Sequence, residues 1–428
     1  DNLDVVNDTI RTLKREISAL RAALDSIGNE APAAALDAGE VALATAAYVW
    51  NLKEVLAKGT VQERRSFVEY FVSSATLQSA PLAPGYLTFS AFYKKTGAFQ
   101  SVNVALTQGA TAQAVLHQGA VPVFADIDPK TYNLDPAQVE ARVTSRTRAI
   151  LAVHLHGLPA EMDAINALAE RDGIPVIEDA AQAHGARYRG RPVGTLALIA
   201  AFSLNSTKNL PAGEGGLFVT ASEECYARAA RARFNGLDPD MVYDPVRPLD
   251  GEADSLATTH GWMYLPGELT SALARSQLER LAATTERSQA NAARLTARLA
   301  ELPGVEPPFV APDRTHVFHK YRVRLDPARA GVGWAPGLLR DRVLSALRAE
   351  GVEVVLWQTA PLPAHPLFAS REPYPEAAAA LEASLVVGSQ SYPLFAQPVR
   401  VVDAWADAFE KVWAHLPELS PRGVSRDD

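Results

Sequence analysis

The fold of this chain is decided by the stretch Phe202-Ser203-Leu204-Asn205-Ser206-Thr207-Lys208-Asn209-Leu210-Pro211-Ala212-Gly213-Glu214-Gly215-Gly216. It places one lysine among hydroxyl and amide side chains and follows it with three glycines. This combination suits the binding of a phosphorylated cofactor, because glycines let the main chain approach a ligand or take a positive φ. The run over residues 217–220 is predicted to be a buried strand that fixes the loop onto a sheet. Taken alone, a serine or threonine beside a lysine is more often a surface turn.

A second stretch, Ile174-Pro175-Val176-Ile177-Glu178-Asp179, is a short apolar run that ends in two acids. This is expected of a buried parallel strand whose carboxyl end opens on a site. Lys208 follows Asp179 in the chain, beyond one further predicted strand over residues 198–203. A carboxylate and a lysine at neighbouring strand ends are what pyridoxal phosphate chemistry needs. The carboxylate keeps the pyridine nitrogen protonated, and the lysine forms the Schiff base and shuttles the proton.

The motifs over residues 178–186, 202–210 and 213–216, at this spacing, resemble the sugar aminotransferases of the DegT/DnrJ/EryC1/StrS family. These are fold-type I pyridoxal phosphate enzymes, and the likeness runs from roughly Val102 to about Leu416. It implies an α/β fold with a mostly parallel, doubly wound large domain and a small α+β carboxy-terminal domain. The predicted divisions are a helical amino-terminal segment over 1–80, the large cofactor-binding domain over 81–270, a linking helix over 271–303 and the small domain over 304–428.

The same resemblance implies roles for individual residues. Lys208, as nucleophile and proton carrier, and Asp179, on the pyridine nitrogen, are the implied catalytic residues. Pyridoxal 5'-phosphate is the implied cofactor, and the residues expected to bind it are Asp179, Gln182, Ser203, Asn205, Lys208 and Thr107. On the substrate side we expect His156, His319 and Trp357, although any one of them taken alone is more often a packing residue.

The chain departs from the family pattern at three places. Relatives carry a Ser-Gly-Thr turn that opens a helix whose N-terminus receives the cofactor phosphate. The nearest tripeptide here, residues 95–97, lies too close before Thr107 to leave room for that helix and its strand. Gln108 stands where relatives usually have an aromatic ring on the pyridine face. Met263 stands where they usually have an asparagine that reaches the phosphate of the neighbouring subunit.

The amino-terminal segment carries apolar residues in steps of three and four over residues 3–27. This heptad seam indicates either a zipper to a second chain or one amphipathic helix on its own domain.

Several further elements are predicted from periodicity. They are helices over residues 223–233, 271–302, 337–351 and 401–416, and strands over residues 149–155, 317–325 and 352–357.

Bulk properties restrict the function classes. The chain has 428 residues, a net charge of −8 and no basic run, which argues against a nucleic-acid or anionic-lipid partner. One cysteine, Cys225, and the lack of a long apolar run favour a cytoplasmic protein without disulfides or a membrane span. His154 and His156 have no third ligand at suitable spacing, so no metal is expected.

The leading hypothesis is transfer of an amino group from glutamate or glutamine to a keto sugar nucleotide or keto cyclitol, in natural-product, antibiotic or surface-sugar biosynthesis. The family implies a homodimer with shared active sites, and the loop over residues 235–259 is expected to cross its interface. Two alternatives stay open. One is another enzyme on the same cofactor, such as a lyase, racemase or carbon–carbon bond former, and the other is a non-catalytic scaffold.

Overall fold

The computed structural model describes residues 100–104, 109–237, 257–368, 370, 372–388 and 392–420, with the side chains of 100–104 left out. All of these residues belong to the second of two compact units, which spans residues 86–428. Several predictions lie outside the described residues: the seam over 3–27, the tripeptide over 95–97, Thr107, Gln108, and most of the loop over 235–259. The division into domains stays a prediction.

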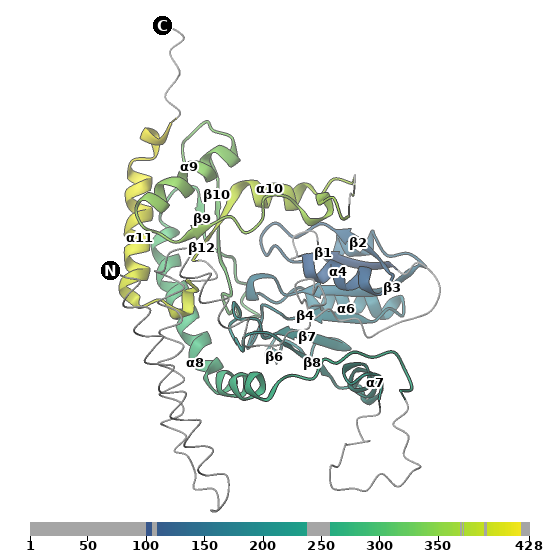
Figure 1. Cartoon of the computed structure of the whole chain (residues 1–428). Helices are drawn as coiled ribbons and strands as arrows, with labels where there is room; N and C mark the ends of the chain where they lie inside the picture. Colours follow the sequence, from purple (N-terminus) through teal and green to yellow (C-terminus); the bar gives the residue numbers. More distant parts are fainter. Residues whose placement is uncertain are drawn as a thin grey trace, which may run out of the picture. The chain divides into compact units, whose positions relative to one another are not determined.

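A six-stranded sheet forms the first half of the described unit, in the order β2-β1-β3-β4-β7-β8 (Figure 1). The first five strands in this order run parallel, and β8 runs antiparallel to β7. The expectation of a mostly parallel sheet is therefore confirmed. The strands are β1 (Gln100–Val104), β2 (Val121–Ala125), β3 (Thr147–Val153), β4 (Val176–Asp179), β7 (Ile199–Ser203) and β8 (Gly216–Thr220).

Helices connect these strands, as the crossovers of a parallel sheet require. Apolar residues at helical spacing bury one face of the helix between β3 and β4, with Met162, Ile165 and Leu168 in the core. The elements between the strands are α4 (Gly109–His117), α5 (Pro136–Glu140), η1 (Leu155–Gly157), α6 (Met162–Arg171) and the short pair β5 (Arg187–Tyr188) and β6 (Arg191–Pro192); α7 (Glu223–Arg233) follows β8.

Helix α7 has the predicted bounds, because its sequence carries signals at both ends. The Ser222 side chain accepts a hydrogen bond from the backbone N–H of Cys225, which caps the first turn. Glu223 and Glu224 lie in that turn and Arg231 and Arg233 in the last one, where each charge complements the helix dipole.

The prediction that residues 217–220 form a buried strand is wrong in its burial. The strand is present as β8, but it lies at the edge of the sheet and is partly open to solvent, with Leu217 40% exposed. The residue types over 217–220 cannot distinguish an edge strand from a central strand, because apolar and β-branched residues are common in both kinds of strand.

A long helix, α8 (Glu268–Leu299), leads into an antiparallel four-stranded sheet in the order β11-β12-β10-β9. Ala292, Leu295 and Leu299 of α8 pack into a hydrophobic cluster that is separate from the one beneath the large sheet. Each such leucine contributes about 1.5–3 kcal/mol through burial. The other elements are β9 (Val305–Glu306), β10 (Tyr321–Leu325), α9 (Pro336–Ala349), β11 (Val354–Val355), η2 (Leu362–Ala364), α10 (Pro375–Ala383), β12 (Ser384–Val387), η3 (Leu394–Ala396), α11 (Val399–Ala414) and η4 (Leu416–Leu419).

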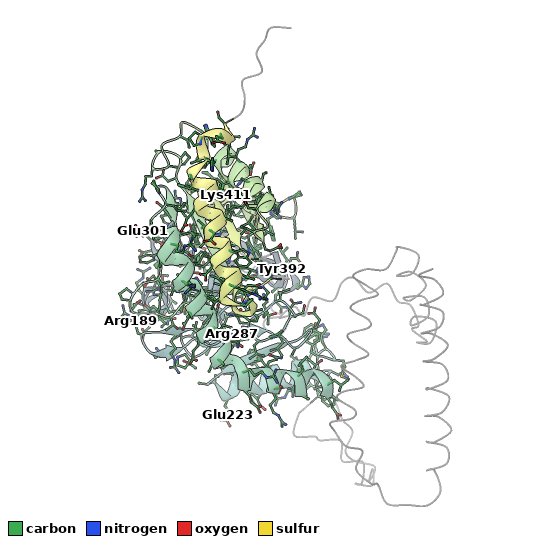
Figure 2. The ribbon with its side chains drawn as sticks, turned by 90° about the vertical axis from the view of Figure 1, so that its left-hand side faces the viewer. Arg189, Glu223, Arg287, Glu301, Tyr392 and Lys411 are labelled. Atoms are coloured by element: carbon green, nitrogen blue, oxygen red, sulfur yellow. The ribbon has the colours of Figure 1, made fainter. Side chains whose placement is uncertain are left out.

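Helix α11 lies alongside α8 in both views (Figures 1 and 2). Arg294 of α8 pairs with Asp403 of α11, and Arg298 pairs with Asp407 at 2.6 Å. At the far end of α11, Lys411 pairs with Glu350 at 2.7 Å. Two of these surface pairs thus join α8 to α11, and the third joins α11 to the end of α9.

Two strand predictions in this half are too long. The strand predicted over 317–325 begins only at Tyr321, because Phe318 takes a positive φ of 47° that is incompatible with a strand. The strand predicted over 352–357 is reduced to Val354 and Val355. Residues 316–320 and 356–358 instead lie as irregular segments beside the loops that follow β3 and β4.

Asp126, directly after β2, links the half that contains the large sheet to helix α10 of the other half. Its carboxylate accepts hydrogen bonds from the backbone N–H groups of Glu376 at 3.0 Å and Ala377 at 2.9 Å, in the first turn of α10. A negative charge at a helix N-terminus satisfies the free N–H groups and the dipole together. Helix α10 also shares the hydrophobic cluster of the large sheet through Ala377, Ala380 and Leu381. Within the described ranges, no helix is both long and apolar enough to cross a membrane.

Candidate functional site

The centre of the candidate site is the pair formed by Asp179, the last residue of β4, and Lys208, in the loop after β7. These strands are neighbours and parallel, so their carboxyl ends bring the two residues to one edge of the sheet. Lys208 is only 6% exposed. Burial lowers the pKa of its amine, the charge of Asp179 raises it, and the net shift is downward. A buried amine with a lowered pKa is suited to act as a nucleophile.

The Asp179 carboxylate is held by two donors. The Thr111 hydroxyl of α4 donates to Oδ2 at 2.6 Å, and the backbone N–H of Ala181 donates to Oδ1 at 3.1 Å. The carboxylate is thus oriented from both the helix and its own strand.

The loop that carries Lys208 is shaped by its own side chains. Asn205 Oδ1 accepts from the backbone N–H of Thr207 at 3.0 Å, and Asn205 Nδ2 donates to Glu214 at 2.8 Å. Ser203 Oγ accepts from the backbone N–H of Asn205 at 3.3 Å. Gly213 and Gly215 take positive φ values of 86° and 132°, as the sequence indicated. The described contacts of Asn205 are therefore those of a residue that organises the loop.

The motif after β4 supplies a second anchor. Gln182 is buried, and its Oε1 accepts a hydrogen bond of 2.7 Å from the backbone N–H of His156. Glu178 is also buried and binds the ring of His154 at 3.1 Å and the backbone N–H groups of Gly194 and Leu196 at 2.7 Å each. Burial raises the pKa of Glu178, but the bonds from His154 and the backbone lower it by more. His154 and Glu178 thus build the scaffold beneath Asp179.

The three residues predicted on the substrate side come together. The rings of His156 and His319 lie edge-on to Trp357, with centroid distances of 5.8 Å and 6.5 Å. Both ring nitrogens of His156, Nε2 of His319 and Nε1 of Trp357 are buried and make no hydrogen bond. Buried polar atoms normally have partners, so these four point to a ligand or ordered water.

Backbone geometry at this cluster is constrained. His156 takes a positive φ of 58°, which is costly for a residue with a side chain and is concentrated at functional sites. At the next residue, Gly157, an added Cβ would lie 2.6 Å from the side chain of Val317. Only glycine allows residues 156–157 and 316–319 to approach this closely.

Residues 316–320 are held against the large sheet by several hydrogen bonds. The Asn209 side chain donates to the carbonyl of Val317 at 3.0 Å and lies 3.3 Å from the ring of His319. The backbone N–H of Lys320 donates to the carbonyl of His156 at 3.3 Å. Asn209 directly follows Lys208, so the same loop positions both the lysine and the histidine.

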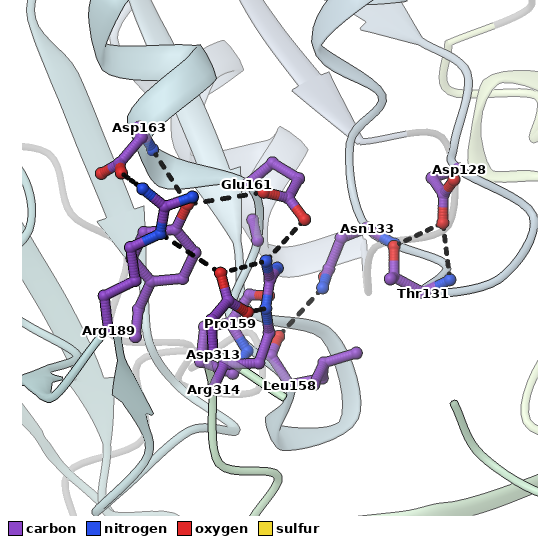
Figure 3. A network of polar contacts seen from close by, with 12 residues as sticks. Asp128, Thr131, Asn133, Leu158, Pro159, Glu161, Asp163, Arg189, Asp313 and Arg314 are labelled. Carbon is purple, nitrogen blue, oxygen red and sulfur yellow. Dashed lines mark hydrogen bonds and ion pairs between the residues drawn. The ribbon is translucent and has the colours of Figure 1, made fainter. Parts of the chain in front are cut away.

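A polar network holds the loop after β3 against the segment that precedes β10 (Figure 3). Arg314 is buried, donates to the carbonyl of Pro159 at 3.1 Å and pairs with Glu161 at 2.6 Å and with Asp313 at 2.8 Å. Asn133 donates to the carbonyl of Leu158 at 2.9 Å, which fixes the same loop from the other side. The network therefore sets the position of residues 156–160 relative to residues 313–320.

The site is strongly cationic and buried. Burial, followed by the charge of Lys208, lowers the pKa of Lys320 to about 8 and that of His184 to about 4. Burial lowers the pKa of His156 and of His319 well below the usual value, and neighbouring cations lower both further. Such a concentration of positive charge and neutral rings suits an anionic ligand. No group of three His, Cys, Asp or Glu side chains suited to a metal occurs in the described part of the chain.

Sequence reasoning missed five residues of this site: Thr111, His184, Asn209, Lys320 and Arg322. For Lys320 and Arg322 a signal exists, because cations occupy alternate positions of an otherwise apolar strand, Lys320-Tyr321-Arg322-Val323. Thr107 and Gln108 lie outside the described residues. Met263 is 60% exposed and pairs through its backbone with Phe234.

Comparisons with known proteins agree with this geometry. The sequence profile of the DegT/DnrJ/EryC1/StrS aminotransferase family matches residues 100–397. The chain is 39% identical to the pleiotropic regulatory protein of Geobacillus stearothermophilus, over 63% of this chain and 66% of that protein, just under two thirds of its length. It is 34% identical to the L-glutamine:scyllo-inosose aminotransferase of Streptomyces griseus, over 86% of this chain and 93% of that protein. Among solved structures, it resembles S. venezuelae DesV in complex with a ketimine intermediate, with 33% identity, a TM-score of 0.62, and coverage of 73% and 78% of the two chains.

Proposed function

The chain belongs to the DegT/DnrJ/EryC1/StrS aminotransferase family, and from this premise we propose that it transfers an amino group from glutamine or glutamate to a keto cyclitol or keto sugar nucleotide. Members of this family are fold-type I enzymes that depend on pyridoxal phosphate. The observation that carries the proposal is the buried Lys208 beside Asp179 at the carboxyl ends of two neighbouring parallel strands.

The residues of the site fit pyridoxal phosphate. Asp179, with both oxygens held by donors, offers a carboxylate for the pyridine nitrogen. Lys208 offers a buried amine for covalent attachment. The family motif implies that Gln182 would lie near the cofactor ring and that the Ser203 hydroxyl would bind the phosphate. When bound, the cofactor supplies a ring that withdraws electrons from the carbon carrying the amino group.

Each residue of the site is assigned its own role in the reaction. Lys208 Nζ would hold and return the proton, and its lowered pKa favours the neutral amine that accepts it. Asp179 would hold the pyridine nitrogen of the bound cofactor, and Thr111 keeps the Asp179 carboxylate in position. Trp357 and the packed rings of His156 and His319 would line the substrate side, where their unpartnered ring nitrogens can hydrogen-bond the substrate.

The acceptor class is supported by one relative in particular. The Streptomyces griseus protein is named for L-glutamine as donor and scyllo-inosose as acceptor, and it aligns with 86% of this chain. We therefore place a keto cyclitol ahead of a keto sugar nucleotide, with a role in antibiotic or related natural-product biosynthesis.

The test is the first half-reaction. Cofactor-loaded protein is mixed with L-glutamine, L-glutamate or L-alanine, and conversion to pyridoxamine phosphate is followed by absorbance. We expect conversion with glutamine or glutamate, and none in Lys208→Ala. If no amine donor converts the cofactor, the chain is not a transaminase.

Two alternatives have their own outcomes. A lyase, racemase or carbon–carbon bond former would retain the pyridoxal form with every donor while altering a substrate. A scaffold would take up no pyridoxal phosphate and show no absorbance band. The scaffold reading has one specific support, namely the 39% identity to a protein named as a pleiotropic regulator.

We also propose a homodimer and a cytoplasmic location. In support of the dimer, Leu269 is 88% exposed and Leu273, one turn further along α8, is also exposed. Exposed apolar residues at helical spacing are typical of an interface. Light scattering of the full chain and of a form lacking residues 1–28 tests the dimer. A monomeric full chain would contradict the dimer. A dimer in both forms would show that the heptad seam over residues 3–27 is not needed for dimerisation.

A further inference from the structure

Arg322 is a buried cation without an anionic partner. Its side chain lies on β10, is 3% exposed, and has no hydrogen bond at either Nε or Nη1. The guanidinium carbon of Arg322 lies 5.0 Å from the centre of the Tyr132 ring. Among the described residues, no carboxylate forms an ion pair with Arg322. A guanidinium keeps its charge in proteins, and an uncompensated buried charge is strongly destabilising. The arrangement is therefore incomplete without an anion.

A second cation lies on the same face of the chain, two residues before it. Lys320 is buried, and its ammonium lies 5.0 Å from the centre of the Trp357 ring. The backbone N–H of Lys320 donates to the carbonyl of His156 at 3.3 Å, and both ring nitrogens of His156 lack a partner. Tyr132, whose ring lies beside Arg322, directly precedes Asn133, and the Asn133 side chain binds the backbone of Leu155 and Leu158 on either side of His156. In keeping with this placement, the charges of Arg322 and Lys320 each lower the pKa of His156, after the larger effect of burial.

We propose that Arg322 and Lys320 form the subsite that binds the carboxylate of the amino-acid donor. The inference rests on the proposed function, because an amino acid must enter the site for its amino group to be transferred. It deepens that function by assigning donor recognition to the small sheet.

Chemistry favours a carboxylate over the other anions. A planar guanidinium matches a carboxylate, and such charge-assisted bonds are the strong ones. A keto cyclitol has no charge for these cations to bind. The cofactor phosphate has its own predicted position at Ser203, in the loop after β7, whereas Arg322 belongs to β10.

The test measures binding without turnover. Cofactor-loaded protein is titrated in a calorimeter with glutaramate, which is glutamine without its α-amino group, and with the neutral diamide glutaramide. Inorganic phosphate is titrated in parallel. The variants are Arg322→Met, Lys320→Met and, as a matched control that removes the same charge from the same strand face, Arg324→Gln.

We expect wild type to bind glutaramate at least about tenfold more tightly than glutaramide. Arg322→Met should lose at least about tenfold in glutaramate affinity and Lys320→Met a smaller factor, with glutaramide unchanged and Arg324→Gln close to wild type. Without ligand, Arg322→Met should melt no lower than wild type, because it removes an unpaired buried charge.

Three results would overturn the subsite. They are glutaramate affinity that survives Arg322→Met, a lower melting temperature of that variant with unchanged affinity, and Arg322-dependent binding of phosphate but not of glutaramate. If Arg322→Met does not fold, Arg322→Lys replaces it, and an undiminished affinity there counts against the guanidinium. Failure of the proposed function is separate: wild type would then bind glutaramate but convert no donor.

Discussion

The hydroxyl of Thr111 donates a 2.6 Å hydrogen bond to Oδ2 of Asp179, across 68 residues of sequence. Helix α4 thereby orients the carboxylate that the proposed function assigns to the pyridine nitrogen of the cofactor. A hydrogen bond to a charged acceptor contributes about 1.5–3 kcal/mol, more than a neutral one.

We expect Thr111→Val to weaken pyridoxal phosphate binding by about tenfold or more, because valine has the same shape but no donor. Thr111→Ser keeps the hydroxyl and is the matched control. An absorbance titration of cofactor-free protein measures both, and equal affinities in all three proteins would show that Thr111 does not support Asp179.

The lowered pKa of Lys208 predicts a pH profile for cofactor attachment. Only the neutral amine attacks, so the rate should rise with pH and level off below the ordinary lysine value of 10.5. The charge of Asp179 raises the pKa of Lys208, so Asp179→Asn should move the midpoint to lower pH. Stopped-flow absorbance between about pH 6 and pH 11 measures the midpoint, and a shift upward in the variant would contradict this account.

The buried histidines predict loss of stability in mild acid. Burial lowers the pKa of His316 to about 3, and burial with the Lys208 charge lowers that of His184 to about 4. These histidines bind a proton more readily when the chain is unfolded, so their stability contribution is present above pH 6.5 and is lost as pH falls toward the folded values. Each histidine should contribute about 1.4 kcal/mol per pH unit in this window.

Urea denaturation at about pH 7.5, 6 and 5 measures this dependence. We expect His316→Asn to reduce the slope of the unfolding free energy against pH by about the contribution of one histidine. His415→Asn, which removes a histidine at an exposed position, is the control. If the unfolding free energy changes with pH by the same amount in wild type, His316→Asn and His415→Asn, the result would argue against the burial of His316.

Glu178 should be essential for stability rather than for chemistry. Its carboxylate accepts bonds from His154, Gly194, Leu196 and Ala197. Glu178→Gln turns one acceptor into a donor that faces N–H groups, and we expect about 3–5 kcal/mol of destabilisation. Glu140→Gln, at an exposed ion pair, should cost less than about 1 kcal/mol. Denaturation curves compare the two, and similar losses would contradict the buried role.

The fold class could be predicted from the sequence because its evidence is local. The run over 174–179 that ends in two acids and the lysine loop after residue 203 are short segments that can be recognised from their residues alone, and they carry the family resemblance from which the fold class was predicted. Helix α7 was predicted to the residue because its caps and charges lie within its own turns. Burial of the strand after the loop was not predictable, because edge position depends on which strands pair.

The amino-acid sequence was enough to predict the family motif, the mostly parallel sheet and the proposed pairing of Lys208 with Asp179. Which other side chains meet these two residues depends on how distant elements pack. Thr111 reaches Asp179, Asn209 holds Val317, and Arg322 lies beside Tyr132 because separate elements pack at these points. The physical reason is the distance along the chain over which each interaction acts. Helix caps and strand patterns involve residues a few positions apart, whereas burial and charge pairing depend on residues that are far apart in the sequence.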